Sequence, residues 1–364
     1  MSGASSYRNP PVVAGLLDRV RRLAVGRAPL RFMEFCGGHT HAIAEYGLRS
    51  LLPDNVRLSS GPGCPVCVTA SGEVDAAIAL AARPGVTVAT FGDMMRVPGT
   101  AGSLSDARAS GADVRVVYSP RDALEIARAC PAAEVVFLGV GFETTAPVVA
   151  AAVLEAEASG VSNFSVLSLH KLTPPAMRAV LDAGEVRLDG IIGPGHVSAV
   201  LGSEAWGFLP RDYRLGCAVA GFEPTDVVSA VVALVEMVAG EEPAVVNAYG
   251  RAVTAAGNRV ALQMLEQVFA PADREWRGLG FVPNSGLQLR PEYADWDAGL
   301  RFDIRPYSAP EPPGCRCGEV LRGVIEPRQC PLFGRACSPA SPVGPCMVSS
   351  EGACAAHYSE AEEQ

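Results

Sequence analysis

EVVFLGV at residues 134–140, followed at once by GFETTAP at 141–147 and the alanine-rich stretch 146–158, decides the fold. An apolar run of this length is typical of a buried strand, and the glycine-containing turn after it leads into a helix. The same order recurs at LRFMEF before CGGHT, VTVATFGD before MMRVPG, DGIIG before PGHVS, and CAVA before GFEPTD. Short strands alternating with helices predict an α/β fold with parallel sheets and helices packed on their faces.

The pattern predicts helices at Glu73–Ala82, Pro120–Ala129, Ala146–Ala158 and Thr225–Val238. GFETTAP and GFEPTD resemble each other, and each follows a strand and opens a helix, which suggests a duplicated architecture. We therefore expect two Rossmann-like α/β domains, residues 1–120 and 121–240. The third region, 241–364, is expected to contain a long helix from about Ala244 to Phe269, an irregular stretch over 271–314 and a cysteine-rich tail.

Charge and hydropathy exclude several classes of partner. The 364 residues carry a formal net charge of −9 and no run rich in Lys or Arg, so nucleic acid and anionic membranes are not expected as partners. No signal peptide and no segment of eighteen uninterrupted apolar residues is visible. We expect a cytoplasmic protein, in which cysteines serve as metal ligands, redox thiols or core residues rather than in structural disulfides.

The tail gathers six of the eleven cysteines: Cys315, Cys317, Cys330, Cys337, Cys346 and Cys354. Structural zinc sites usually pair cysteines two to four residues apart, whereas thiolates spread this widely without histidine favour a 4Fe-4S cluster. We expect Cys315, Cys330, Cys337 and Cys354 as the ligands, with Cys317 able to replace Cys315 and Cys346 packed beside the cluster. Zinc, and buried or redox thiols, remain the alternatives.

Cys64 and Cys67 in GPGCPVC have the two-residue spacing of thiol–disulfide oxidoreductases. Pro65 constrains the turn between them, and the start of the following helix favours the thiolate form. We expect a redox pair, with half of a metal site or a structural turn as the other interpretations.

Three further side chains are candidates for chemistry. Cys36 in CGGHTH follows a predicted strand and has His39 nearby, so it is a candidate metal ligand or activated nucleophile; a buried cysteine before a helix is the simpler alternative. Glu143 in GFETTAP lies near a predicted helix start, where it acts chemically or only shapes the turn. No GxxxxGK[ST] or GxGxxG sequence is present, which argues against a nucleotide-using enzyme.

CGGHTH, GPGCPVC, GFETTAP, GPGHVS and CMVSSEGACAA, in this order between residues 36 and 356, together resemble the hydrogenase maturation factor HypD family. The resemblance implies a scaffold that assembles the iron centre of nickel–iron hydrogenases, in which one iron carries two cyanides and one carbon monoxide. It implies two α/β domains and a third with a 4Fe-4S cluster, a HypC-type small chaperone as partner and a HypE-type protein as cyanide donor.

Carried onto this sequence, the resemblance implies that Cys36 is an iron ligand and that Cys64 and Cys67 are the redox pair. It assigns the cluster to Cys315, Cys330, Cys337 and Cys354. Such a protein is an assembly scaffold with redox activity rather than a conventional turnover enzyme. The competing interpretations are an iron–sulfur-dependent protein disulfide oxidoreductase and a zinc-stabilised interaction module.

Overall fold

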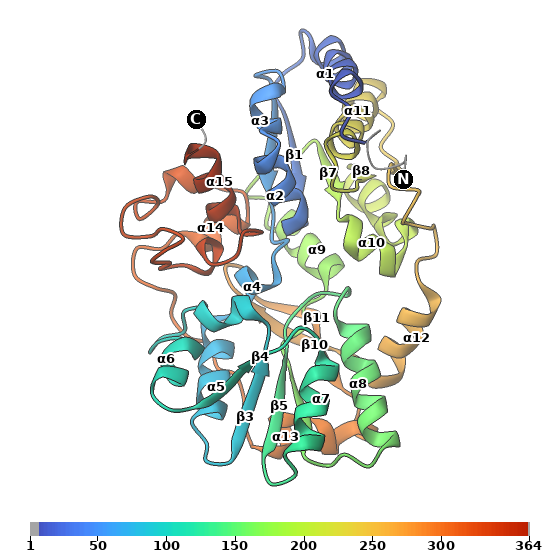
Figure 1. Ribbon diagram of the computed structural model, residues 1–364. Helices are drawn as coiled ribbons and strands as arrows, with labels where there is room; N and C mark the ends of the chain where they lie inside the picture. The colour runs from blue at the N-terminus through green and yellow to red at the C-terminus, as the bar shows by residue number, and fades with distance from the viewer. Residues whose placement is uncertain (1–6, 363–364) are drawn as a thin grey trace.

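The computed structural model describes residues 7–362 and places the strands in two parallel sheets and one antiparallel hairpin (Figure 1). The five-stranded sheet has the order β2-β1-β7-β8-β9 and the four-stranded sheet the order β4-β3-β5-β6. The predicted α/β class with parallel sheets is confirmed. The strands of the two parallel sheets are β1 Leu30–Glu34, β2 Val56–Ser60, β3 Val86–Thr90, β4 Asp113–Val116, β5 Glu134–Gly139, β6 Phe164–Ser168, β7 Gly190–Gly193, β8 Gly216–Val219 and β9 Val245–Asn247.

The two sheets are interleaved along the chain. The five-stranded sheet takes strands from 30–60 and from 190–247, while the four-stranded sheet comes from 86–168. The expected ranges 1–120 and 121–240 therefore each supply strands to both sheets. Both sheets share one order, in which the first strand lies between the second and the third, as expected for two related α/β units.

Helices cover the sheets, and the four predicted from the sequence are present as α5, α7, α8 and α11. The longer helices are α1 Pro10–Ala24, α2 Gly37–Glu45, α5 Ser71–Ala81, α7 Pro120–Ala129, α8 Ala146–Ala158, α9 Thr173–Ala183, α11 Pro224–Gly240, α12 Arg259–Val268 and α15 Ala353–Glu362. The shorter ones are α3 Leu48–Leu51, α4 Pro65–Val68, α6 Leu104–Ala109, α10 Gly195–Leu201, α13 Ala298–Arg301 and α14 Cys317–Leu321.

The core of the upper half in Figure 1 lies between the five-stranded sheet and helices α1 and α11. Val20 of α1, Val231 of α11 and Phe32 of β1 are fully buried there. Burying an aliphatic or aromatic side chain of this size contributes roughly 1.5–3 kcal/mol. This packing fixes the position of β1, which ends at Glu34, two positions before Cys36.

The expected helix from Ala244 to Phe269 is wrong. The segment instead forms β9, a loop, and α12, which begins only after Asn258. The Asn258 side chain accepts hydrogen bonds from the amides of Val260 and Ala261 and so caps α12. Gly257 has φ +71°, and a Cβ there would overlap the carbonyl of Val200. Contact of this loop with α10 therefore interrupts a stretch whose composition alone favours a helix.

The stretch over 271–314 was expected to be irregular, but much of it is ordered. Strands β10, Phe269–Trp276, and β11, Gly280–Leu289, form an antiparallel hairpin with an irregularity between Ala272 and Arg274. Trp276 is buried, and its indole donates a hydrogen bond to Ser285 Oγ at 2.8 Å. The hairpin lies between the two halves of the molecule in Figure 1.

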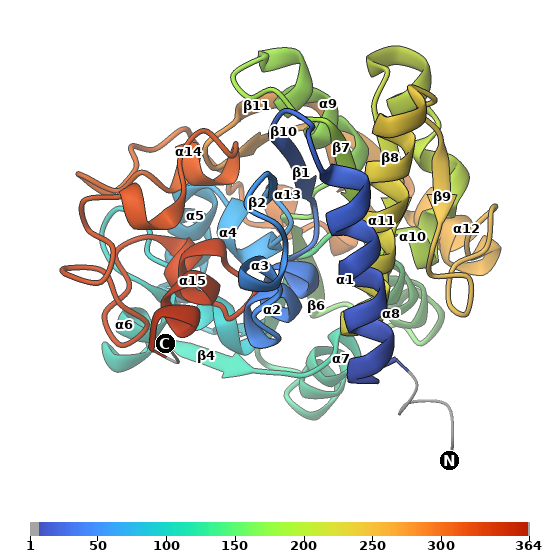
Figure 2. The same ribbon diagram turned by 90° about the horizontal axis from the view of Figure 1, so that it is seen from above.

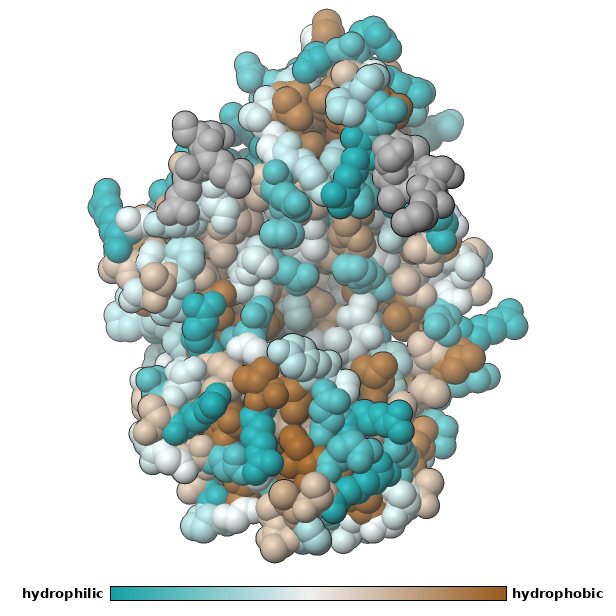
Figure 3. Space-filling model, viewed as in Figure 1, coloured by the Kyte–Doolittle hydropathy of each residue, from teal (hydrophilic) through white to brown (hydrophobic). Residues whose placement is uncertain are grey.

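The C-terminal segment, which contains α14 and α15, lies along one side of the molecule. Viewed from above, α15 lies beside α2 (Figure 2), and the two helices are in contact. The surface in Figure 3 is hollowed between the two halves, and hydrophobic side chains gather over the lower, four-stranded half. Among the helices that the structure describes, none combines the length and apolar character needed to cross a bilayer.

Candidate functional site

Cys36 lies at the carboxyl end of β1 and is the residue before α2. In open parallel sheets, ligands bind where strand order reverses, outside the carboxyl ends of the two central strands. Here those strands are β1 and β7. The turn after β1 carries Cys36, and the first turn of α10, which follows β7, carries His196. The fold thus brings two sequence motifs, CGGHTH and GPGHVS, to one point.

The Cys36 turn interlocks with the turn that carries Cys64 and Cys67. The Gly37 amide donates a hydrogen bond to the Gly63 carbonyl at 2.8 Å. Gly63 packs so closely that a Cβ there would overlap the backbone nitrogen of Cys36. Glycine is needed at 63 because the two backbones touch. Contact between these turns was not visible in the sequence, where their cysteines are 28 positions apart.

Cys64 and Cys67 form a disulfide with their Cα atoms 5.2 Å apart. Cys64 is the residue before α4, and its sulfur accepts a hydrogen bond from the Cys67 amide at 3.2 Å. Both side chains are buried, with exposed fractions of 3% and 0%. Cys67 Sγ lies 3.9 Å from the Pro345 carbonyl oxygen, so the disulfide borders the C-terminal segment.

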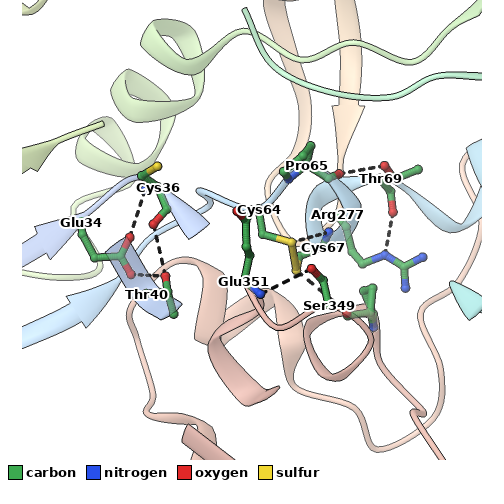
Figure 4. Close-up of a disulfide and its surroundings, with 11 residues drawn as sticks. Glu34, Cys36, Thr40, Cys64, Pro65, Cys67, Thr69, Arg277, Ser349 and Glu351 are labelled. Carbon is green, nitrogen blue, oxygen red and sulfur yellow. Dashed lines mark hydrogen bonds between the residues drawn. A yellow bond between two sulfur atoms is a disulfide. The ribbon is translucent and has the colours of Figure 1, made fainter. Parts of the chain in front are cut away.

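The C-terminal segment also reaches the Cys36 turn through Glu351. A Cβ on Gly37 would lie 2.6 Å from Glu351 Cβ. Figure 4 shows Glu351 between Cys36 and the disulfide. Burial, and next the charges of Glu351 and Glu34, raise the pKa of the Cys36 thiol to about 12. The free thiol therefore keeps its proton at neutral pH, and a metal that binds Cys36 must displace that proton.

His39 lies in α2, three residues after Cys36, and is fully buried. Its Nε2 donates to the carbonyls of Ala220 and Gly221 at 3.1 and 3.0 Å, which leaves Nδ1 unprotonated. Burial lowers its pKa to about 4, so the ring is neutral at physiological pH. The Phe222 ring stacks against both His39 and His196, with centroids 4.9 and 3.9 Å apart. Both imidazoles thus pack against one aromatic ring.

Glu34, at the end of β1, supports the Cys36 turn from inside the protein. Its carboxylate accepts hydrogen bonds from the Cys36 amide at 3.0 Å and from the Thr40 hydroxyl. Burial is the largest effect on this carboxyl and raises its pKa to about 7. Thr40 lies inside α2, so its hydrogen bond ties the first turns of this helix to Glu34 at the end of β1.

Glu34→Gln should become more stable relative to the unchanged protein as pH rises from about 4.5 to about 7. Folded Glu34 keeps its proton to higher pH than the unfolded chain does, so its ionisation opposes folding across this window. The gain should be on the order of 3 kcal/mol or less, at about 1.4 kcal/mol per pKa unit. Urea unfolding at a series of pH values measures it. The exposed Glu125→Gln is the control, and parallel curves for Glu34→Gln and the unchanged protein would contradict the assignment.

Glu143 lies in the turn after β5, at the corresponding reversal of the four-stranded sheet. Its buried carboxylate accepts hydrogen bonds from the Thr173 amide at 2.7 Å and the Thr173 hydroxyl at 2.9 Å. Burial raises its pKa to about 7. These contacts fix the start of α9, so in this structure Glu143 shapes the turn.

All of the six tail cysteines except Cys315 are buried. The same buried cluster holds the disulfide and four of them, Cys317, Cys337, Cys346 and Cys354. The Cys317 thiol, and next burial, raise the pKa of the Cys315 thiol. The thiols of Cys317 and Cys354 raise the pKa of Cys346. The neighbouring thiols of Cys315 and Cys346 lower the pKa of Cys317. The Cys337 sulfur accepts a hydrogen bond from the Val343 amide at 3.3 Å.

Buried soft thiol donors in this number suit iron–sulfur or zinc ligation. Within residues 7–362, no group of three or more His, Cys, Asp or Glu side chains stands together in a form that could hold a metal ion. The expected ligand set, Cys315 or Cys317 with Cys330, Cys337 and Cys354, therefore stays a prediction.

Sequence reasoning named Cys36, His39, Cys64 and Cys67 but overlooked the groups that hold them. Glu34 reads as part of a strand, and Phe222 as part of a turn. Glu351 lies in SSEGAC, three residues before Cys354, and only the cysteine was considered as a functional residue. The one signal in the sequence for Glu351 is that it lies inside the CMVSSEGACAA motif.

The fold and site define a class: an α/β protein that brings a single cysteine, a CxxC pair and a cysteine-rich segment together between two parallel sheets. A family model described as "HypD: Hydrogenase formation hypA family" matches residues 11–361. The chain belongs to the HypD family.

Relatives match over nearly their whole length. "Hydrogenase maturation factor HypD" of Rhizobium leguminosarum bv. viciae is 49% identical over 98% of this chain and 95% of that protein. "Hydrogenase maturation factor HypD2" of Bradyrhizobium diazoefficiens is 48% identical over 98% and 96%. "Hydrogenase maturation factor HypD" of Escherichia coli K12 is 45% identical over 100% and 99%. The expected family is confirmed.

Proposed function

We propose that this protein is the scaffold on which the iron centre of a nickel–iron hydrogenase, carrying two cyanides and one carbon monoxide, is assembled. A HypC-type small chaperone shares the iron, and a HypE-type protein supplies the cyanide. The names of the relatives support the hydrogenase maturation role. The iron is the cargo of this reaction, and Cys36 is its ligand on this chain.

One observation carries the proposal: the Cys36 turn, the Cys64–Cys67 turn and the C-terminal segment are in mutual contact. Gly37 bonds to Gly63, Glu351 packs on Gly37, and Cys67 borders Pro345. Iron that takes up cyanide and carbon monoxide needs a soft thiolate ligand, electrons and a shielded site. A thiol, a dithiol and a cysteine-rich segment side by side match these needs.

The protein's own residues have distinct roles in this proposal. Cys36 keeps its proton until iron arrives, because burial opposes the thiolate. His39 holds the Cys36 turn against Ala220 and Gly221 and stays neutral. Glu143 fixes the start of α9 and acts by positioning.

Cys64 and Cys67 store two electrons as dithiol and release them on closing the disulfide. In the tail, Cys315 or Cys317 with Cys330, Cys337 and Cys354 would hold a 4Fe-4S cluster. When bound, the cluster supplies electrons one at a time.

Cys64→Ser should stop maturation and leave the iron and acid-labile sulfide of the C-terminal segment unchanged. The variant cannot close the disulfide, whereas the tail cysteines remain in place. Hydrogenase activity in cells that carry the variant as their only HypD protein, together with iron, sulfide and zinc content of the anaerobically purified protein, tests this. Loss of the cluster in the variant would overturn the separation of roles, and zinc without sulfide in the unchanged protein would overturn the cluster.

The alternative is an iron–sulfur-dependent oxidoreductase that reduces a partner's disulfide. That activity requires the partner's sulfurs to reach Cys64 or Cys67, which are 3% and 0% exposed. Burial of both sulfurs beside Cys36 favours an internal electron donor instead.

A further inference from the structure

The turn at the tip of the β10–β11 hairpin, Arg277-Gly278-Leu279, lies between α4, which carries Cys67, and α14 of the cysteine-rich tail. It is formed by residues that the sequence did not single out, and Arg277 is among the largest fully buried side chains. A buried guanidinium is costly unless its donors are satisfied. The partners of Arg277 therefore show what the tip holds together.

On one side, Arg277 grips the end of the short helix that carries Cys67. Its amide donates to the Val68 carbonyl at 2.9 Å, and its Nε donates to the Thr69 carbonyl at 2.8 Å. Thr69 also forms a bridge with Trp276. The helix α4 is only four residues long, so it has little stability of its own. Its geometry depends on what holds its end.

The remaining donors of Arg277 reach two more segments. Nη1 bonds to the Glu311 carboxylate at 2.9 Å, and Nη2 bonds to the Pro98 carbonyl at 3.2 Å. The Arg277 side chain thus joins the end of α4 to Glu311, which lies four residues before Cys315. Glu311 balances the buried charge.

On the other side, the tip packs against α14, which begins at Cys317. A Cβ on Gly318 would lie 2.8 Å from Gly278 Cα, and one on Gly278 would overlap Gly318. Arg322, one turn further along, donates to the Gly278 carbonyl. The two backbones touch, so a displacement of α14 must move the tip.

We propose that Arg277 is a positioning residue for the dithiol: the hairpin tip clamps the Cys64–Cys67 turn and links its geometry to α14 of the tail. This deepens the proposed function and relies on it for the biological purpose, although the clamp itself is a physical property of the chain. With the clamp in place, the two sulfurs are held within reach of each other, which favours the closed disulfide. Without it, α4 frays and the sulfurs separate.

The test is the redox equilibrium of this one pair. When the disulfide opens, two glutathione thiols are oxidised to one glutathione disulfide, and Cys64 and Cys67 each gain a proton and an electron. The full-length protein is equilibrated anaerobically in glutathione buffers of graded ratio, starting from both the oxidised and the reduced protein, until the two agree. Because Cys64 and Cys67 are buried, exchange with glutathione occurs only when the site opens transiently, and this agreement shows that equilibrium has been reached. Differential alkylation and mass spectrometry of the peptide with Cys64 and Cys67 then give the midpoint.

Arg277→Met should make the disulfide about tenfold easier to reduce, which is a midpoint about 30 mV less negative. Gly318→Ala should shift the midpoint in the same direction, because the added methyl group would clash with Gly278 and displace the tip. Alanine favours helix formation, so this variant should not unfold α14. Two controls match these changes. Arg290→Met removes a comparable arginine–carbonyl bond, Nε to Glu266, at the other end of the hairpin. Gly240→Ala adds a methyl group in a helix with open space around it.

Unchanged midpoints in both Arg277→Met and Gly318→Ala would overturn the clamp, as would an equal shift in Arg290→Met. If Arg277→Met does not fold, Gly318→Ala alone decides. These outcomes are separate from those of the maturation assay. Should Cys64→Ser mature hydrogenase normally, the proposed function fails while the shifted midpoint still stands.

Discussion

Replacing Cys36 with serine should reduce hydrogenase maturation by at least about 100-fold, since even the loss of a group that merely supports a metal ligand typically costs 10–100-fold in affinity or activity. A serine hydroxyl fits the turn but is a hard donor that does not ionise near neutral pH, so it cannot replace a thiolate on iron. Hydrogenase activity in cells, and the infrared bands of iron-bound cyanide and carbonyl in the purified protein, measure the effect.

The matched control for this variant is Cys130→Ser. Cys130 is also a free cysteine, but it follows α7 in the lower half of the molecule and has no place in the proposed site. The folded stability of Cys36→Ser should stay near that of the unchanged protein. Full maturation by Cys36→Ser would contradict the assignment of Cys36 as the iron ligand.

Gly63→Ala should destabilise the protein by several kcal/mol and abolish maturation. A methyl group at 63 would meet the backbone of Cys36 and Phe35 rather than the movable end of a side chain. The two turns must then separate, and the Gly37–Gly63 hydrogen bond is lost. Overpacking of this kind typically costs 1–3 kcal/mol and more where backbone must shift. Thermal or urea unfolding gives the stability.

Gly15→Ala provides the comparison for that variant. Gly15 lies in α1 with open space around it, so alanine there should stabilise the helix by roughly 0.5–1 kcal/mol. If Gly63→Ala unfolds like the unchanged protein and matures hydrogenase, the interlocking of the two turns has no role.

Local features of the fold could be predicted from the sequence, because they depend on short patterns. Helices α7 and α8 have the predicted bounds, since each starts at a turn and runs on helix-favouring residues. Which strands pair could not be predicted: the apolar runs of β1 and β3 look alike, and nothing within either specifies its sheet. The similarity of GFETTAP and GFEPTD also misled in detail, because they follow the third strand of one sheet and the fourth of the other.

The candidate site divides in the same way. Cysteine motifs with short spacings are visible in the sequence, so Cys36 and the Cys64–Cys67 pair could be named. Glu351 and Arg277, in contrast, act through tertiary contacts with residues 314 and 208 positions away, Gly37 and Thr69. An ordinary charged residue in a strand or turn carries no local signal that its partner lies across the molecule.

The interleaving of the two sheets has a consequence for synthesis on the ribosome. About 130 residues separate the end of β2 from the start of β7, which pairs with the inner edge of β1. At about 5–20 residues per second, translation of this interval takes on the order of 10 s. The four-stranded sheet is contiguous from 86 to 168 and can close within that time. Nascent β1 waits meanwhile with an open edge, and such an edge is where a growing chain is most exposed to mispairing.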